Sequence, residues 1–393
     1  MNPPPATESG RLDLPPPDAD AIALSSRLAD KIVARIEQRG GVIGFDEYMQ
    51  MALYEPGHGY YVGGRTKFGA AGDFVTAPEI SPLFGECLAA QAARLMEQGC
   101  AAAILEFGAG SGRLCAQILE ALPLLERYSI LDMGAELGQR QREYLQSRLS
   151  ADRFARIEWL SELPQAFDGI VLANEVLDAM PVHLIEKQGG WHERGVAHDE
   201  GFVWKPRPPD NRVRAAIERL EDELGEFADG YRSEVNLNYG PWINALAQSC
   251  ARVVVMIIDY GYERAQYYHP ARREGSLICH YRHRVHDDPL IYPGLQDITA
   301  FVDFDAVADA AETAGFEICG LARQGEFLLA NGLLEMADRR GEAAAGLEAR
   351  GKLAQQVKTL TLPQEMGERF KVLALQKGLR VELPALRPGA VHG

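Results

Sequence analysis

Three glycines at alternate positions, Gly108, Gly110 and Gly112, follow a short apolar run that ends in Glu106. A stretch with helical spacing begins directly after them, so we predict a strand, a tight glycine turn and a helix. In an open α/β sheet such a turn lies at the carboxyl ends of the strands, where ligands bind. Glycine lets the backbone approach a ligand closely, and the next helix points free N–H groups at it. The expected chemistry is binding of a nucleotide-like ligand.

The spacing of the glycines excludes two phosphate-binding patterns. A dinucleotide fingerprint needs G-x-G-x-x-G, but Arg113 stands where the third glycine would be, and no Gly-Lys-Ser/Thr forms a P-loop. S-adenosylmethionine fits better, because it has no phosphate and offers acids an ammonium group and ribose hydroxyls. We therefore predict that Glu106 lies near its amine and that Asp132, which ends the second expected strand, accepts hydrogen bonds from the ribose. Leu160 and Asn174, each at the end of an expected strand, complete the cofactor-binding set.

A second polar cluster, Asn174, Glu175 and Asp178, directly follows the expected strand 167–173. One interpretation is a helix N-cap made by Asn174 or Asp178. The other is catalytic, because polar residues at the end of a buried strand lie over the same crevice as the glycine turn. Glu175 and Asp178 would then fix and polarise a nitrogen nucleophile, and a carboxylate pairs well with a guanidinium.

Three histidines at a spacing of three, His280, His283 and His286, raise the question of a metal ion. No H-E-x-x-H or C-x-x-C motif accompanies them, and Arg282 and Arg284 between them would repel a cation. We therefore expect no metal ion. The segment is interpreted as a loop that faces the substrate or as a plain surface loop.

Strands that alternate with helices predict an α/β fold with a doubly wound, mostly parallel sheet. The expected strands are 103–105, 128–131, 157–160, 167–173, 253–259 and 370–375, and the expected helices are 19–39, 83–98, 212–227 and 303–315. The segment 45–82 is dense in turn residues and lacks a long periodic run, so it is interpreted as an extended loop. A loop of this length is uncommon unless it is functional.

We divide the chain into six parts by composition and pattern. These are a disordered tail (1–18), an N-terminal helical and lid segment (19–98), the first half of the cofactor-binding core (99–185), an insertion or cap (186–245), the second half of the core (246–380) and a tail (381–393).

Composition narrows the function further. The net charge of −16 argues against sequence-independent binding of DNA or RNA, which needs clustered Lys and Arg. No run approaches the ~18 apolar residues of a membrane helix. The six cysteines form no C-x-x-C pair and lie mostly in apolar surroundings, so we expect reduced thiols and a cytoplasmic location.

Taken together, several stretches resemble the MidA-type methyltransferase family. They are GHGYYVG (57–63), GDFVTAPEISPLFGE (72–86), LEFGAGSGRL (105–114), ANEVLDAMPVH (173–183), DYG (259–261), GSLICHYRHRVHDDP (275–289), DIT (297–299) and MGERFKVLAL (366–375). The resemblance implies a seven-stranded Rossmann-like class I methyltransferase sheet with added helical and loop insertions, and S-adenosylmethionine as the cofactor. It also implies transfer to an arginine of a protein. Mitochondrial members assist assembly of respiratory complex I, so a respiratory-chain subunit is an implied substrate, and the eukaryotic relatives are placed in the mitochondrial matrix.

The family pattern also implies that residues 72–79 fold over the cofactor as a lid, with Asp73, Thr76 and Glu79 near the site. Three functions stay open at this point. The first is arginine methylation of a protein. The second is methylation of a small molecule or a hydroxyl oxygen, for which His183 or His286 would serve as general base. The third is an assembly factor that binds the cofactor without turnover.

Overall fold

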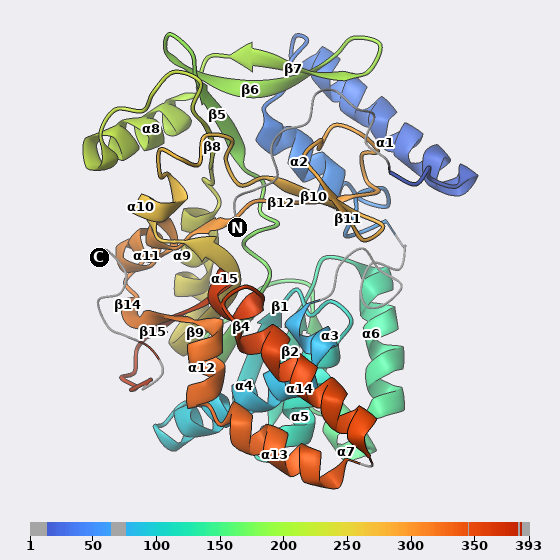
Figure 1. The fold of residues 1–393 in the computed structure, drawn as a ribbon, viewed down its shortest axis with the longest axis vertical. Helices are drawn as coiled ribbons and strands as arrows, with labels where there is room; N and C mark the ends of the chain where they lie inside the picture. Colours follow the sequence, from blue (N-terminus) through green and yellow to red (C-terminus); the bar gives the residue numbers. More distant parts are fainter. Residues whose placement is uncertain (1–13, 64–75, 345, 384–385, 387–393) are drawn as a thin grey trace.

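The structure is a computed structural model that describes residues 14–63, 76–344, 346–383 and 386 (Figure 1). Its centre is a twisted sheet covered by helices on both faces. The strands are, in order across the sheet, β14 (Glu317–Arg323), β15 (Phe370–Lys377), β9 (Cys250–Tyr262), β4 (Phe167–Asn174), β1 (Ala103–Phe107), β2 (Arg127–Leu131) and β3 (Ile157–Leu160). A short additional strand, β13 (Val302–Asp303), pairs with the end of β9.

Strands β3, β2, β1, β4 and β9 are parallel, and β15 runs antiparallel to both of its neighbours. The chain builds β1, β2 and β3 toward one edge and then crosses back to place β4 and β9 on the other side of β1. The strand order therefore reverses between β1 and β4. Such a reversal is the switch point at which doubly wound sheets bind ligands. The predicted fold class is confirmed.

Alternate residues of the buried strands face opposite helix layers, as the period of a strand requires. In β9, Val254 and Met256 pack against the layer that contains α4 (Pro82–Glu97) and α5 (Arg113–Ala121). Val253 and Val255 face the other layer, which contains α9 (Tyr239–Ser249) and α11 (Phe304–Thr313). The remaining helices around the sheet are α3 (Ala77–Ile80), α6 (Ala135–Arg148), α7 (Ala151–Phe154), α12 (Gln324–Ala330), α13 (Leu333–Ala343), α14 (Leu347–Thr361) and α15 (Met366–Arg369).

A second packed unit lies beyond the carboxyl ends of the parallel strands (Figure 1). We call it the cap. It contains the helices α1 (Ala19–Gln38), α2 (Phe45–Tyr54), α8 (Asn211–Leu224) and α10 (Arg264–Tyr267). It also contains two antiparallel sheets. The four-stranded sheet has the order β7 (Phe202–Arg207), β6 (Trp191–His198), β5 (His183–Lys187) and β8 (Arg232–Val235). The three-stranded sheet has the order β11 (Arg284–His286), β10 (Ile278–Tyr281) and β12 (Asp297–Thr299). Its core joins apolar side chains of α1 and α2 to both small sheets.

The structure corrects one expectation about the cap and adds to another. Residues 45–54, expected as extended loop, form α2, which buries Phe45, Tyr48 and Leu53. The sequence hides this helix because it is short and Gly44, its N-cap, makes no side-chain cap. The insertions are partly helical, as expected, and they also contain two small sheets whose pairings are antiparallel.

All six cysteines are free, and five of them are buried, as their apolar surroundings predict. No helix in the described ranges has the length and apolar character needed to cross a membrane. Residues 1–13 of the predicted tail 1–18 and residues 72–75 of the predicted lid 72–79 fall outside the described residues. At the end of the predicted tail, Asp18 is the N-cap of α1, so this part belongs to the start of a helix.

Candidate functional site

A cavity of about 1020 Å³ lies where the cap meets the carboxyl ends of the central strands. Its floor is the turn after β1 and the end of β4, at the switch point of the sheet. Its cap side includes Gln50 and Tyr54 of α2 and the nearby Tyr61. The cavity is large enough for a cofactor and for part of a second molecule.

The predicted glycine turn forms the floor. Gly108, Gly110 and Gly112 have φ angles of 61°, 54° and 82°, a region that side-chain-bearing residues rarely adopt. Gly112 is the N-cap of α5, which begins at Arg113 without a side-chain cap. The unsatisfied N–H groups of this helix end are therefore available to a ligand over the turn. Glycine is needed here for both conformation and close approach.

Asp132 is held at the cavity by a network that the sequence did not reveal. Its Oδ2 accepts a hydrogen bond of 2.9 Å from Gln141 Nε2, which also donates to the carbonyl oxygen of Gly110 at 3.0 Å. Gln141 Oε1 in turn accepts from Trp159 Nε1 at 3.1 Å. Gln141 is fully buried on α6, so it connects the turn after β1 with the ends of β2 and β3. The network fixes the position of the Asp132 carboxylate. Leu160, at the end of β3, also lines the cavity.

Glu106 lines the cavity from the end of β1, but only 2% of it is exposed. Its Oε2 accepts a hydrogen bond of 2.8 Å from the Tyr128 hydroxyl. Burial raises the pKa of Glu106 to about 8, although this hydrogen bond lowers it. A cationic group bound beside Glu106 would stabilise its ionised form.

The polar loop after β4 holds its acids in a constrained backbone. Glu175 has a φ of 53°, and its N–H donates to the carbonyl of Ile258 at 2.9 Å. Its Oε1 accepts from Asn174 Nδ2 at 3.1 Å. Both residues line the cavity, and Asn174 Oδ1 is buried with no hydrogen-bond partner in the part of the chain described. Burial, and then the charge of Asp178, raise the pKa of Glu175 to about 8.

Behind Glu175 lie two more buried carboxyl groups. Asp178 is 4% exposed, and Asp259 at the end of β9 is fully buried. Asp259 Oδ2 accepts from the backbone N–H groups of Leu177 and Asp178 at 3.0 and 3.3 Å, which fixes the loop. Burial raises the pKa of Asp178 to about 6, while a hydrogen bond from Tyr260 lowers it. Burial also raises the pKa of Asp259 well above its usual range.

Two tyrosines of the cap lie on the other side of the cavity, and one of them contacts this loop. The Tyr54 hydroxyl donates to the carbonyl of Ala179 at 2.9 Å, and the Tyr61 hydroxyl donates to Asp297 Oδ1 at 2.8 Å. The two rings stack with centroids 5.5 Å apart. The acidic loop is therefore enclosed between the core and the cap.

Part of the predicted lid lies against the glycine turn. Thr76 lines the cavity at the start of α3. The Glu79 carboxylate accepts a hydrogen bond from the Ser111 hydroxyl and pairs with Arg113 Nε at 2.5 Å. Glu79 thus holds the turn rather than pointing free into the cavity. Asp73 lies outside the described residues.

The two predicted histidines do not line the cavity. His183 is buried at the start of β5 and faces Asp46 and Glu193. His286 is buried in β11, where its Nδ1 accepts from the backbone N–H of Asp288 at 3.3 Å. Burial lowers the pKa of His286. The structure offers neither of them as a base at the cavity.

Among the residues that were not predicted from the sequence, Asp259 could have been identified as a site residue by its position. It ends an apolar strand just as Asp132 ends another. Gln141 and Tyr61 carried none, because their roles depend on helices and loops from separate parts of the chain.

The buried Glu106 predicts a measurable dependence of stability on pH. Its folded pKa of about 8 lies above the unfolded value of about 4.3, so its protonated form favours folding at low pH. This stabilisation is lost as the pH rises through 8. Between pH 6 and pH 8 the free energy of unfolding should fall by roughly 2 kcal/mol. Urea unfolding of the protein without cofactor should show this loss, and Glu106→Gln should lack it. Equal pH slopes for both proteins would contradict the assignment.

The residues at the cavity fit S-adenosylmethionine. The glycines leave room for its amino-acid part, and the carboxylates of Glu106 and Asp132 suit its ammonium group and ribose hydroxyls. Asn174 Oδ1 accepts no hydrogen bond from the described residues, so it can accept one from a bound ligand.

Comparison with known proteins agrees with this fit. Residues 87–322 match the model of a family described as S-adenosyl-L-methionine-dependent methyltransferases. The chain is 31% identical to the mitochondrial protein arginine methyltransferase NDUFAF7 of Mus musculus, over 85% of this chain and 81% of the relative. The Drosophila melanogaster homolog is 29% identical over 92% and 88%. A crystal structure from Burkholderia thailandensis, bound to S-adenosyl-homocysteine, is 42% identical with a TM-score of 0.88, covering 95% of this chain and 97% of that one.

Proposed function

This chain belongs to the family of S-adenosyl-L-methionine-dependent methyltransferases, and on that premise we propose that its methyl acceptor is an arginine side chain of a protein. The family match confirms the resemblance, the enzyme class and the cofactor expected from the sequence. Several similar proteins are named protein arginine methyltransferases. The observation that carries the proposal is Glu175, a carboxyl group at the cavity backed by the buried acids Asp178 and Asp259.

We assign the cofactor to the floor of the cavity. Gly108, Gly110 and Gly112 would pass beside its amino-acid part, Asp132 would accept from the ribose hydroxyls, and Glu106 and Asn174 would face its amine. Leu160 adds an apolar contact. When bound, S-adenosylmethionine supplies a methyl group activated by a positively charged sulfur. The task of the protein is then to position and polarise the acceptor, because an in-line displacement depends mainly on orientation and electrostatics.

The acidic loop suits a guanidinium. An arginine keeps its charge below about pH 12, so its nucleophilic nitrogen needs a partner that draws the charge to the other nitrogens. A carboxylate does this by paired hydrogen bonds, and Glu175, which lines the cavity, would take this role. Asp178 lies behind Glu175 and adds negative charge to the site. Its own carboxylate is oriented by the hydrogen bond from Tyr260. After transfer the acceptor nitrogen loses a proton, which the Glu175 carboxylate can take because burial raises its pKa to about 8.

The substrate is proposed to be a protein, with a subunit of a respiratory complex as the first candidate. The cytoplasm is the proposed location, since the six cysteines are free thiols.

Transfer of a labelled methyl group into a lysate tests the proposal. The purified enzyme and radiolabelled S-adenosylmethionine are added to host lysate, and proteins are separated from small molecules. We expect label in a protein fraction, recovered as methylarginine after hydrolysis, and its loss with Glu175→Gln. Label confined to small molecules would support the second function considered above and overturn this one. Cofactor binding without any transfer would support the third.

A further inference from the structure

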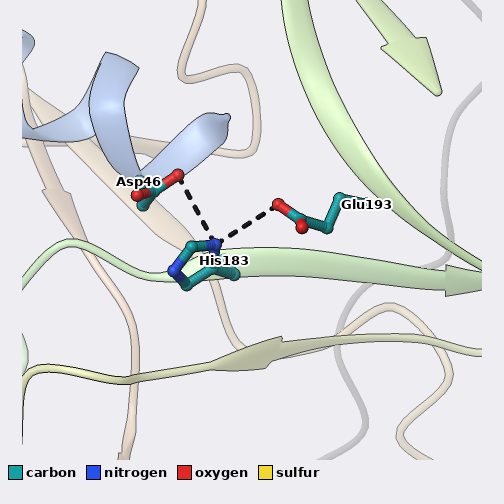
Figure 2. Close-up of side chains that lie close together, drawn as sticks. All are labelled: Asp46, His183 and Glu193. Atoms are coloured by element: carbon teal, nitrogen blue, oxygen red, sulfur yellow. Dashed lines mark hydrogen bonds and ion pairs between the residues drawn. The ribbon is translucent and has the colours of Figure 1, made fainter. Parts of the chain in front are cut away.

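A second cluster of titratable side chains lies away from the cavity, where α2 meets the four-stranded sheet of the cap (Figure 2). Asp46 is in the first turn of α2, His183 begins β5, and Glu193 lies on β6. One ligating atom from each lies within 4.8 Å of the other two. His183 and Glu193 are buried, whereas 32% of the Asp46 side chain is exposed.

Two carboxylate oxygens from different segments lie close to the same ring nitrogen of His183. His183 Nδ1 lies 3.5 Å from Asp46 Oδ1 and 3.3 Å from Glu193 Oε2. One proton on Nδ1 can form the 3.3 Å hydrogen bond with Glu193, but it cannot point at Asp46 Oδ1 at the same time. Ligand atoms held about 2.0–2.2 Å from a tetrahedral Zn²⁺ are about 3.3–3.5 Å apart. The two observed separations match two edges of such a tetrahedron.

We propose that Asp46, His183 and Glu193 bind a divalent transition-metal ion of the Zn²⁺ type, with water as fourth ligand. One imidazole nitrogen and two carboxylate oxygens are donors that this ion accepts. The exposed side of Asp46 leaves access for the ion and the water. This site departs from the expectation of no metal ion, because its ligands come from three separate segments that show no spacing motif.

The surroundings of the cluster support an ion. Glu193 Oε1 accepts a hydrogen bond of 2.8 Å from the backbone N–H of Asp210, which orients the other oxygen toward His183. Arg207 interacts with the carboxylates of both Asp46 and Glu193. A metal-ligating imidazole is neutral, so the two carboxylates leave a net negative charge at the site that the single guanidinium of Arg207 offsets only in part.

The position of the ion indicates a structural role. The helix α2 carries Gln50 and Tyr54 on the cavity wall, and β5 continues directly from the acidic loop that carries Glu175. An ion between α2 and β5 would join these two walls. It would stabilise the cap at the acceptor side without touching a reacting atom.

Titration of the metal-free full chain with Zn²⁺ tests the proposal. We expect one saturable equivalent per chain, and at least about a tenfold loss of affinity in Asp46→Asn. Asp20→Asn is the matched control, because Asp20 is an exposed aspartate in the first turn of α1. Zn²⁺ should raise the melting temperature of the wild type and of Asp20→Asn but not of Asp46→Asn.

Substitution with Co²⁺ locates the bound ion. A tetrahedral site with nitrogen and oxygen ligands gives visible absorption without the sulfur-to-metal charge transfer that a cysteine ligand would cause. His183→Gln, with its fold checked by circular dichroism, should remove this absorption. Absence of saturable Zn²⁺ binding, equal affinity in Asp46→Asn and wild type, or a charge-transfer band would overturn the proposal and leave the cluster as an ion pair.

Discussion

Gly110→Val is expected to weaken S-adenosylmethionine binding by about a hundredfold or more, a loss of at least about 2.7 kcal/mol. Gly110 has a φ of 54°, which a β-branched side chain adopts only with strain. The turn would have to change its backbone, and the carbonyl of Gly110 would leave its hydrogen bond with Gln141. The same Gln141 side chain holds Asp132, so the Asp132 carboxylate would also lose its fixed position. Calorimetric titration with the cofactor measures the effect, and methyl transfer should fall in parallel.

Gly315→Val is the control for this substitution. Gly315 also has a positive φ, 83°, and a side chain there would meet open space. It lies between α11 and β14, far along the chain from the glycine turn. We expect this variant to lose stability but to keep its cofactor affinity. A folded Gly110→Val protein that binds the cofactor as the wild type does would disprove the assigned site.

Glu175→Gln is expected to lower the rate of methyl transfer by about 10²–10³-fold while leaving cofactor affinity nearly unchanged. The amide keeps the size and the accepting oxygen of Glu175, but it loses the charge that holds and polarises a guanidinium. At acceptor concentrations well below saturation, the wild-type rate should rise with pH through about 8, because Glu175 ionises in the enzyme without acceptor, and this rise should disappear in the variant. Single-turnover kinetics at several pH values would measure both effects.

Glu162→Gln is the matched control, because Glu162 is an exposed acid that also lines the cavity. Its transfer rate should stay close to that of the wild type. If Glu175→Gln loses binding and transfer equally, Glu175 is a cofactor or structural residue instead. A rate that stays at the wild-type level would place the acceptor elsewhere.

The parts of this protein that the sequence predicted are those set by local pattern. Continuous apolar runs predicted β4 and β9, because strands buried on both faces need apolar residues at every position. Alternate glycines predicted the turn after β1. Since the carboxyl ends of parallel strands meet at one edge, the polar residues that end them were predicted to share a crevice. Asp132 and Glu175 both line one cavity in the structure.

The cap was not predictable in the same way. Its small sheets pair antiparallel segments whose short strands carry weak signals, and α2 is too short to show a clear period. His183 was a candidate general base for methylation of a small molecule or a hydroxyl oxygen. A shift of one residue in strand register turns a side chain to the opposite face of the sheet. In β5 the observed register points His183 toward Asp46 and Glu193.

The sequence by itself determined the central sheet, the glycine turn and the acids at its edge, because each depends on residues that are neighbours in the chain. Only the tertiary structure decided how those acids are held. Gln141 orients Asp132, Asp259 fixes the loop of Glu175, and Tyr54 closes it from the cap. The packing around the cavity also buries Glu106 and Glu175, and this burial raises the pKa of each to about 8. Burial comes from segments far apart in the sequence packing together, so a one-dimensional pattern cannot contain it.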